Sequence, residues 1–529
     1  MPDDTRLKPS HIANAEKVIG LAFTAAERQL MLDDVKEQVA RFEQLRRIPI
    51  ANAIPPALAF DPRLPGMTFE TKKRRPRYSR PPRLRAPSNL EDAAFWPVSH
   101  LAYLLRTRQV SSVELTRMYL ERLQRFDPVL KCVVTFTDDL ALRQARRADR
   151  ELKRGEYRGL LHGIPYGAKD LLATRGIRTT WGAEPYRDQV FDYNATVIDR
   201  LDKAGAVLIA KLSVGALAWG DVGLDGVMTR NPWNLDEGSS GSSAGSASAT
   251  AAGAVAFAIG TETLGSIVSP STRCRVTGLR PTFGRVSRFG AMALSWTMDK
   301  IGPIARTVED CAIVFDAIHG PDGRDLTVTD YTFNYDARLD VRSLRVGYVK
   351  RAFDQERDNK TNDDTSLEVL KSLGIRLIPI DLPALPVDAS AIVLVAEAAA
   401  AFDELTRTNR DDELARQVKD AWPNVFRRAR LIPAVEYIQA SRVRTQLMAA
   451  LRDRMADIDV YVAPSFDDTN LILTNLTGHP AVVVPNGVDA KGQSSSLTFT
   501  GKLYGEAATL SVAKAYQDAT KFHLRHPAM

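Results

Sequence analysis

Residues 238–246 read GSSGSSAGS, and the chain continues directly into ASATAAGAVAFAIG (247–260) and TETLGS (261–266). A Gly/Ser-rich run on its own is typical of a flexible linker. Here it leads into a long series of small and apolar residues, which predicts a tightly packed helix or helix–strand junction. We therefore interpret this stretch as part of a buried core rather than as a spacer between domains.

Two other interpretations of residues 238–246 are disfavoured. A phosphate-binding loop requires Gly-Lys-Ser/Thr, which this stretch lacks. Gly241 to Gly245 match the G-x-S-x-G pattern of a nucleophile elbow, but that pattern needs a strand immediately before it. Residues 229–237 read TRNPWNLDE and predict a proline-containing loop instead.

Short apolar runs elsewhere in the chain are typical of buried strands, and helix-like stretches alternate with them. The predicted strands lie at 206–210, 344–349, 375–382, 460–463 and 481–484, and the predicted helices include 307–319 and 362–373. Ser111 and Glu114 form a capping box that predicts a further helix start. Strands interleaved with helices indicate an α/β protein whose sheet is covered on both faces.

The first 90 residues differ in character from the rest of the chain. Residues 13–47 predict charged helices, and residues 50–88 predict a long, proline-stiffened connection. We therefore predict two parts, an N-terminal helical appendage with a basic Pro-rich linker (1–90) and one main domain (91–529).

Positive charge is concentrated in this linker. The 529-residue chain carries a net charge of +7. Residues 72–85 contain eight Lys or Arg residues and no acid, so the remainder carries 7 − 8 = −1. We favour a solvated linker. Contact with phosphate groups, nucleic acid or a membrane surface is the alternative.

Composition disfavours several classes of protein. Three scattered cysteines, Cys132, Cys274 and Cys311, predict neither a disulfide framework nor a zinc site, and we expect no cofactor. Reduced thiols fit a cytoplasmic location. The most apolar stretch, 391–402, is too short to cross a bilayer, and the first residues lack the pattern of a secretory signal.

Several segments carry a family resemblance, in the same order as in that family. They are LHGIPYGAKD (161–170), TRNPW (229–233), SGSSAGS (240–246), GTETLGSI (260–267), VTGLRPTFGRVS (276–287), NLTGHPAVVVP (475–485) and FTGK (499–502). Together they resemble the amidase-signature family, from about Phe95 to the end of the chain. The resemblance implies that family's fold, a central mixed twisted β-sheet covered by helices on both faces. It also implies an amidase acting on C–N bonds other than peptide bonds.

The resemblance further implies a catalytic triad. Ser266 matches the family's nucleophile, Ser242 matches its bridging serine, which follows a cis peptide bond, and Lys169 matches its base. A lysine has an ordinary pKa of about 10.4, so its surroundings would have to lower it by about three units, at a cost of roughly 4 kcal/mol. Taken alone, Lys169 would be interpreted as a salt-bridge partner of Asp170.

The same motifs bear on the oxyanion hole and on an alternative base. Histidine is the usual base for a serine nucleophile, but only His162 and His479 lie within the motifs, and both are interpreted as structural residues. By resemblance, the oxyanion hole consists of the backbone N–H groups of Thr263, Leu264, Gly265 and Ser266.

The motifs depart from the family pattern at five positions. Leu264, Ser240 and Ala244 stand where glycines are usual, and Glu262 replaces an aspartate. Val268 stands where many members have arginine, so we expect no ion pair between positions 262 and 268. These departures leave every reactive group in place but change the loop around the predicted nucleophile.

The substrate is less well defined by the sequence. Ala218 and Trp219, by resemblance, and Phe466, after the strand at 460–463, are candidates for the substrate pocket. The favoured function is hydrolysis of small amides, and also of esters or carbamates, through an acyl-enzyme on Ser266. A homo-oligomer is left open as the assembly, and a nucleic-acid partner is disfavoured. The alternative is the glutaminase component of a tRNA-dependent amidotransferase, because the N-terminal helices resemble the small partner protein of that complex. The third interpretation is a non-catalytic binding protein.

Overall fold

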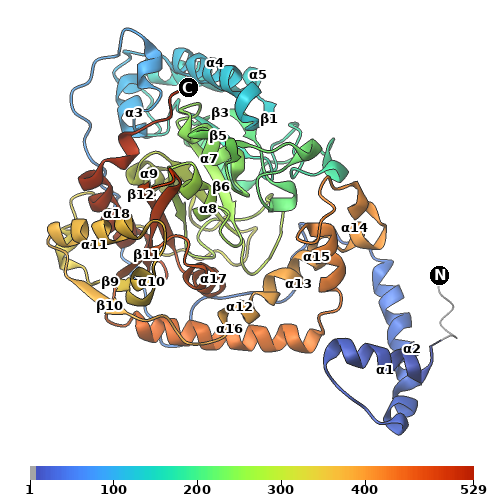
Figure 1. The fold of residues 1–529 in the computed structure, drawn as a ribbon. Coiled ribbons are helices and arrows are strands. Elements are labelled where there is room, and N and C mark those ends of the chain that lie inside the picture. The colour runs from blue at the N-terminus through green and yellow to red at the C-terminus, as the bar shows by residue number, and fades with distance from the viewer. Residues whose placement is uncertain (1–6) are drawn as a thin grey trace.

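The structure is a computed structural model that describes residues 7–529. Its body is built around one mixed sheet of eleven strands (Figure 1). In spatial order these are β1 (Val133–Phe136), β3 (Val207–Leu212), β2 (Pro165–Lys169), β6 (Phe257–Glu262), β8 (Lys300–Ala305), β7 (Thr277–Arg280), β12 (Ala481–Val488), β13 (Ser494–Gly501), β11 (Val460–Pro464), β9 (Val346–Val349) and β10 (Leu377–Ile380). β3, β2 and β6 are parallel, the pairs from β6 to β11 are antiparallel, and β11, β9 and β10 are parallel again.

Helices cover both faces of this sheet. Every residue of β2, β3, β6 and β8 is buried, and successive side chains of a strand point to opposite faces. The helices of the body are α3 (Val98–Arg106), α4 (Ser112–Leu130), α5 (Asp138–Lys153), α6 (Thr196–Lys203), α7 (Ala244–Ala251), α8 (Val268–Arg273), α9 (Val308–Ile318), α10 (Lys350–Asp354), α11 (Lys360–Ser372), α12 (Val387–Ser390), α13 (Ile392–Ala401), α14 (Asp403–Arg407), α15 (Trp422–Ala429), α16 (Ala434–Arg454), α17 (Asp468–Thr477) and α18 (Glu506–Thr520). The predicted strands and helices are all present, and the predicted capping box starts α4.

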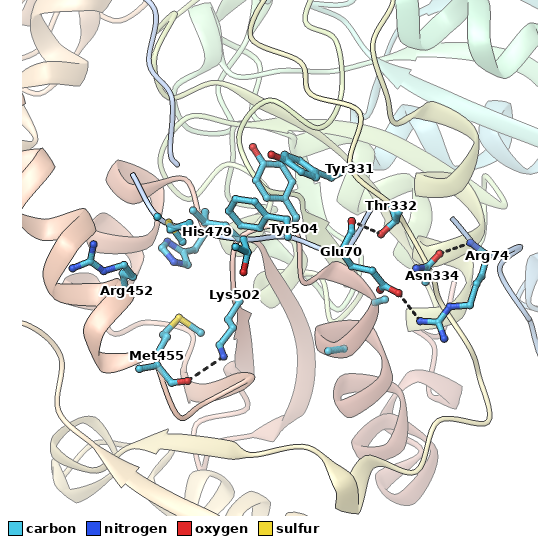
Figure 2. Close-up of a pocket in the computed structure, with 18 of the residues that line it drawn as sticks. Glu70, Arg74, Tyr331, Thr332, Asn334, Arg452, Met455, His479, Lys502 and Tyr504 are labelled. Carbon is cyan, nitrogen blue, oxygen red and sulfur yellow. Dashed lines mark hydrogen bonds and ion pairs between the residues drawn. The ribbon is translucent and has the colours of Figure 1, made fainter. Parts of the chain in front are cut away.

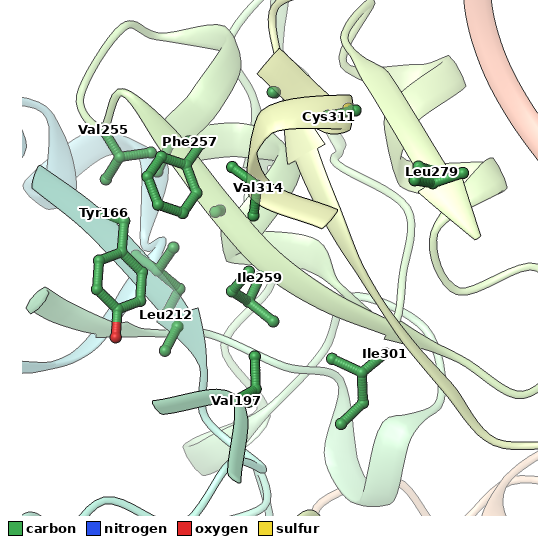
Figure 3. Close-up of a cluster of buried hydrophobic side chains, with 14 of the residues drawn as sticks. Tyr166, Val197, Leu212, Val255, Phe257, Ile259, Leu279, Ile301, Cys311 and Val314 are labelled. Carbon is green, nitrogen blue, oxygen red and sulfur yellow. The ribbon is translucent and has the colours of Figure 1, made fainter. Parts of the chain in front are cut away.

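The core around β2 and β6 fixes the position of these two neighbouring strands (Figure 3). Tyr166 of β2 and Phe257 of β6 are register partners, and their rings stack with centroids 5.2 Å apart. Such a pair contributes about 0.5–1.5 kcal/mol beyond the area it buries. Leu212, Ile259 and Val314 belong to the same buried cluster. The core thus aligns the strands that carry Lys169 and lead to Ser266.

The N-terminal residues form a helical hairpin that projects from the body (Figure 1). It consists of α1 (Pro9–Ile19) and α2 (Ala25–Arg46). The carboxylate of Glu16 accepts two hydrogen bonds of 2.8 Å from the guanidinium of Arg28, which joins the two helices. The predicted helical appendage is therefore present, with a break near residue 20.

Residues 48–88, which we call the strap, are extended and lie along the body. The guanidinium of Arg444 in α16 lies 3.5 Å from the ring centroid of Phe60. Lys73, within the basic run, forms a 2.8 Å ion pair with Asp330. The basic linker is thus extended, as predicted, but it is attached to the body instead of being fully solvated. The division at residue 90 stays a prediction.

The expectation of a strand-free loop at 229–237 is wrong. Residues Arg230–Asn231 (β4) and Asn234–Gly238 (β5) pair as a small antiparallel hairpin separate from the main sheet. Residues 234–236 are exposed, so this hairpin has no apolar pattern by which it could be predicted. It does not supply the main-sheet strand that a nucleophile elbow requires.

Candidate active site

Lys169 is the last residue of β2, the third strand from one edge of the sheet. Its Nζ lies 2.8 Å from Ser242 Oγ, 3.0 Å from Ser243 Oγ and 2.9 Å from Thr261 Oγ1. The carbonyl oxygen of Thr261 is 3.3 Å away. The side chain of Lys169 is fully buried, so three hydroxyls and one carbonyl surround this nitrogen.

The alternative salt bridge between Lys169 and Asp170 is not formed. Asp170 instead lies 3.0 Å from Lys211 Nζ and accepts hydrogen bonds from the backbone and hydroxyl of Thr180. Within residues 7–529, no carboxylate forms an ion pair with Lys169. Burial therefore holds the pKa of Lys169 well below its usual value, which favours the neutral amine that can accept a proton.

Ser242 occupies a tight turn before α7. The Gly241–Ser242 peptide bond is cis, as the resemblance implied. A Cβ atom at Gly241 would lie 1.7 Å from the carbonyl oxygen of Gly220, so only glycine fits at this position. The backbone N–H of Gly215 donates to the carbonyl of Ser242 at 3.4 Å. The loop around residues 215–220 therefore packs directly on the turn that presents Ser242.

Ser266 lies in the loop between β6 and α8, and it is 8% exposed. Its carbonyl oxygen accepts a 3.2 Å hydrogen bond from the N–H of Ser243, so the two serine-bearing segments are in contact. Its hydroxyl has no hydrogen-bond partner in the described part of the chain and is not bonded to Ser242. Of the three predicted triad residues, Lys169 and Ser242 are thus in contact, and Ser266 lies on the adjacent segment.

The loop before Ser266 has the properties of an oxyanion hole. Within residues 7–529, no hydrogen bond is donated by the backbone N–H groups of Thr263, Leu264, Gly265 and Ser266. Gly265 has a φ of +82°, a conformation that favours glycine. Leu471 of α17 packs against Gly265. Backbone N–H groups that donate no hydrogen bond within the protein are available to bind an oxyanion when their loop is fixed in position.

A buried network of charged and polar groups stabilises this loop. The sequence did not predict this network. Glu262 lies 2.7 Å from Arg280 and accepts hydrogen bonds from Asn475 and from the backbone N–H groups of Ile267 and Val268. Burial alone would raise the pKa of Glu262, but the Arg280 guanidinium lowers it to about 2. As expected, Val268 provides no ion pair; Arg280 provides it from β7.

A second support comes from Asp299, which the sequence also did not indicate. The hydroxyl of Thr263 donates a 2.6 Å hydrogen bond to Asp299 Oδ1. The other oxygen accepts from the backbone N–H groups of Leu294 and Ser295. Burial raises the pKa of Asp299. The loop that carries Ser266 is therefore tied to residues 294–299.

The two histidines of the motifs have structural surroundings. His162 is buried and its Nε2 lies 2.9 Å from Glu151. His479 is buried 2.8 Å from the hydroxyl of Thr477, and burial lowers its pKa to about 3. Neither contacts Ser242 or Ser266 in the structure. The interpretation of both as structural residues agrees with these contacts.

The three candidate pocket residues lie in segments that adjoin the site. Ala218 has a φ of +64°, an uncommon conformation for a non-glycine residue, and belongs to the loop that packs on Ser242. The ring of Trp219 meets that of Trp422 edge-on at 4.6 Å. Phe466 is 47% exposed and follows β11 just before α17. Their contact with a substrate stays a prediction.

A cavity of about 670 Å³ lies elsewhere, between the strap and the C-terminal end of α16 (Figure 2). Its lining includes His479 but none of the three triad residues. Its charged groups are paired: Arg74 lies 2.9 Å from Glu70, and Lys502 lies 3.5 Å from Asp459. This cavity therefore provides no uncompensated charge and no reactive group for the hydrolysis of an amide.

Comparison with known proteins agrees with the geometry. The profile of the amidase family matches residues 114–471. The A subunit of glutamyl-tRNA(Gln) amidotransferase from Roseiflexus castenholzii is 36% identical over 484 residues, which cover 81% of this chain and 97% of that protein. No helix within residues 7–529 is both long enough and apolar enough to span a membrane.

Solved structures share the fold over most of the chain. Peptide amidase from Stenotrophomonas maltophilia has a TM-score of 0.73 at 28% identity, covering 82% of this chain and 99% of that chain. An amidase family protein from Bacillus anthracis has a TM-score of 0.74 at 26% identity, covering 83% and 93%. The chain therefore belongs to the amidase family, as an amidase-signature enzyme that hydrolyses C–N bonds of amides.

Proposed function

We propose that the protein hydrolyses small carboxylic amides through an acyl-enzyme on Ser266, with Ser242 and Lys169 as the proton relay. The observation that carries this proposal is the buried, unpaired amine of Lys169, 2.8 Å from Ser242 Oγ. It lies beside a loop whose N–H groups are unused. A base, a relay hydroxyl and an oxyanion site are what attack on an amide carbonyl requires.

The hydrogen bonds around Lys169 support a direction for the relay. Ser243 Oγ donates to the carbonyl of Thr261 at 3.1 Å and accepts from its N–H at 3.2 Å, so in its contact with Lys169 the hydroxyl can only accept. The carbonyl of Thr261 can also only accept. A neutral amine has two hydrogens and one lone pair. Thr261 Oγ1, 2.9 Å away, is a third possible acceptor for these hydrogens. When the hydrogens point to these acceptors, the lone pair faces the hydroxyl of Ser242.

The reaction follows from this arrangement. Lys169 takes the Ser242 proton, Ser242 takes the Ser266 proton, and Ser266 Oγ attacks the carbonyl carbon. The N–H groups of residues 263–266 bind the developing oxyanion. The proton returns through Ser242 to the leaving nitrogen as the C–N bond breaks, and water then hydrolyses the acyl-enzyme by the same relay. Ala218, Trp219 and Phe466 would contact the substrate.

Active-site labelling tests this assignment. A fluorophosphonate reacts with an activated serine, and mass spectrometric peptide mapping locates the adduct. We expect one adduct, on Ser266, which is absent from Ser266→Ala and retained in the matched variant Ser243→Ala. An adduct on Ser242 or Ser243, or unchanged labelling of Ser266→Ala, would contradict the assignment.

A second candidate function rests on the 36% identity to the amidotransferase relative. By this alternative, the amide hydrolysed is glutamine, and the ammonia passes to a partner acting on tRNA. Ammonia release from glutamine, compared with acetamide and benzamide, separates the two functions. A strong preference for glutamine that increases when tRNA and a partner are added favours the alternative. Efficient hydrolysis of the simple amides by the isolated chain favours the main proposal.

A further inference from the structure

A second, larger cavity lies between the N-terminal segment and the body. Its volume is about 880 Å³, within the range of small-molecule sites. Six aromatic side chains line it: Trp181, Tyr186, Phe191, Tyr193, Trp296 and Phe402. Several of them are in mutual contact, with the rings of Trp181 and Tyr186 4.5 Å apart and those of Trp181 and Phe402 6.3 Å apart. We call this cavity the aromatic chamber.

The roof of the aromatic chamber is the beginning of the strap. Ile48, Ile50 and Ile54 line the chamber, yet they are 57%, 68% and 58% exposed. These three isoleucines leave apolar surface in contact with water above the aromatic floor, of which Trp181 and Phe402 are themselves buried. A ligand that fills the chamber would remove this surface from water, which is favourable in proportion to its apolar area.

One side chain attaches this roof to two walls. Asn52 accepts a 2.8 Å hydrogen bond from the N–H of Ala293 and donates one of 2.9 Å to the carbonyl of the same residue. Its amide also donates to the carbonyl of Ala401 at 3.4 Å. The side-chain amide of Asn52 pairs with the backbone of Ala293 as a neighbouring strand would, so it fixes the position of the roof. The cavity below the roof is not filled by side chains of the protein.

The charges at the chamber define the ligand. The charged residues of the lining lie at helix ends. Arg407 bonds Asp403 at 2.6 Å, and Arg46 bonds Glu43, outside the lining, at 2.8 Å. Arg47 and Glu404 also line the chamber, carry opposite charges and form no ion pair within residues 7–529. The roof and the aromatic walls carry no charge. A ligand that matches this surface is uncharged, bulky and aromatic or otherwise apolar.

We infer that the aromatic chamber is a binding site for an uncharged aromatic or bulky apolar group, with residues 48–56 as its roof. None of Lys169, Ser242 and Ser266 lines it. The inference rests on the cavity and its surface, and it does not require the catalytic roles proposed above.

The chamber is connected to the oxyanion loop by a short path. Ala293 is bound by Asn52 of the roof, and the next residue, Leu294, donates its N–H to Asp299 at 2.8 Å. Asp299 in turn accepts from Thr263 of the oxyanion loop at 2.6 Å. Two kinds of ligand share the chemistry that the chamber requires. One is the apolar part of the amide substrate itself, and the other is a separate effector that acts through this path.

The strap offers a matched pair of variants for the test. Ile50 and Leu58 are equally exposed, at 68%, but only Ile50 lines the chamber. Neither is packed in the core, so neither substitution threatens folding. We would measure binding of 1-naphthol to the full chain by isothermal titration calorimetry. We expect one saturable site in the wild type, an affinity about tenfold or more weaker in Ile50→Asp, where a charge faces the apolar site, and unchanged affinity in Leu58→Asp.

Absence of saturable binding to the wild type, or equal affinities of the two variants, would overturn the inference. Ser266→Ala should bind 1-naphthol like the wild type, so this outcome does not depend on the proposed catalytic serine.

Kinetics then separates the two sources. If the chamber binds part of the substrate, Ile50→Asp raises KM for naphthalene-1-acetamide but not for acetamide, and 1-naphthol competes with the aromatic amide. If the ligand is a separate effector, 1-naphthol changes kcat for acetamide in the wild type and not in Ile50→Asp. Either result supports the chamber as a binding site and identifies its ligand's role.

Discussion

At the scale of single residues, the proposed chemistry depends on one lysine being uncharged. Three hydroxyls and a carbonyl surround Lys169 Nζ in place of water, and no carboxylate within residues 7–529 forms an ion pair with it. Burial outweighs the more distant charges of Asp299 and Glu262, which favour the protonated form. The neighbouring acid, Asp170, is engaged with Lys211. Two buried lysines on adjacent strands thus differ in their surroundings, because only Lys211 contacts a carboxylate.

Replacing Lys169 by alanine should lower kcat/KM by about 10²–10⁴-fold, because a positioned general base typically contributes this much. Burial lowers the pKa of Lys169, and the protonated form cannot accept a proton. Wild-type activity should therefore rise with pH through that pKa, and Lys169→Ala should lack this acid limb. A pH–rate profile of both proteins measures it. An unchanged acid limb in the variant would show that another group is the base.

Arg280 should be essential for stability and for the oxyanion loop. Arg280→Met leaves Glu262 as an unpaired buried charge, which typically costs about 3–5 kcal/mol. The double variant Glu262→Gln/Arg280→Met should recover much of this loss, because the charge is also removed. Urea unfolding of the three proteins measures the effect. If the double variant is no more stable than Arg280→Met, the ion pair is not the cause.

The sequence indicated the candidate reactive residues, whose roles stay a prediction, but not the residues that support them. Lys169, Ser242 and Ser266 stand in motifs, and Lys169 and Ser242 are in contact as expected. Arg280 and Asn475 bind Glu262 from 18 and 213 residues away, and Asp299 binds Thr263 from 36 residues away. No local pattern indicates such pairs, because strand order in the sheet brings them together.

At the scale of elements, apolar patterns predicted the buried strands and failed for the exposed hairpin of β4 and β5. Every residue of β3 or β11 is buried, so these strands read as continuous apolar runs. The polar sequence of β5 lies at the surface and is held by pairing with β4. Buried strands can thus be predicted from their apolar sequence, whereas an exposed strand such as β5 has no such pattern.

Helix α9 contains a buried carboxyl group whose protonation should affect stability. Asp310 accepts a 2.9 Å hydrogen bond from the N–H of Val98, and burial raises its pKa to about 7. Between about pH 4 and pH 7 the folded state holds a proton that the unfolded state releases, so this group's contribution to stability declines as pH rises. Asp310→Asn retains the acceptor and removes the titration.

We therefore expect Asp310→Asn to be more stable than the wild type at pH 8, by about 1–3 kcal/mol, with a much smaller difference at pH 4. Thermal unfolding of both proteins at the two pH values measures this. A difference that is the same at both pH values would contradict the assigned titration.

At the scale of the whole molecule, the strap joins the projecting hairpin to the body by contacts along its length, from Asn52 to Tyr78. Phe60 packs under the buried Arg444, and a desolvated contact of this kind contributes about 2 kcal/mol. The pair between Lys73 and Asp330 is more than half exposed on both sides and contributes little.

Phe60→Ala should loosen the strap around residue 60, whereas Lys73→Ala should leave it in place. The strap is rich in Lys and Arg, so trypsin cleavage within residues 48–88, followed by mass spectrometry, reports this loosening. We expect cleavage several-fold faster in Phe60→Ala, consistent with the loss of about 1 kcal/mol or more, and near the wild-type rate in Lys73→Ala. Equal rates in all three proteins would mean that Phe60 does not anchor the strap.

The placement of Lys169 at the end of a central strand has a consequence for how such enzymes diversify. Thr261 lies on the neighbouring strand β6, so the main-chain hydrogen bonds between β2 and β6 set the spacing between Lys169 and Thr261. The segments with Ala218, Trp219 and Phe466 lie outside these two strands. Insertions near Phe466 can therefore reshape the recognised molecule while the spacing between Lys169 and Thr261 is unchanged. Insertions near Ala218 also reach the turn of Ser242, on which residues 215–220 pack, so specificity can change there only together with the position of that serine.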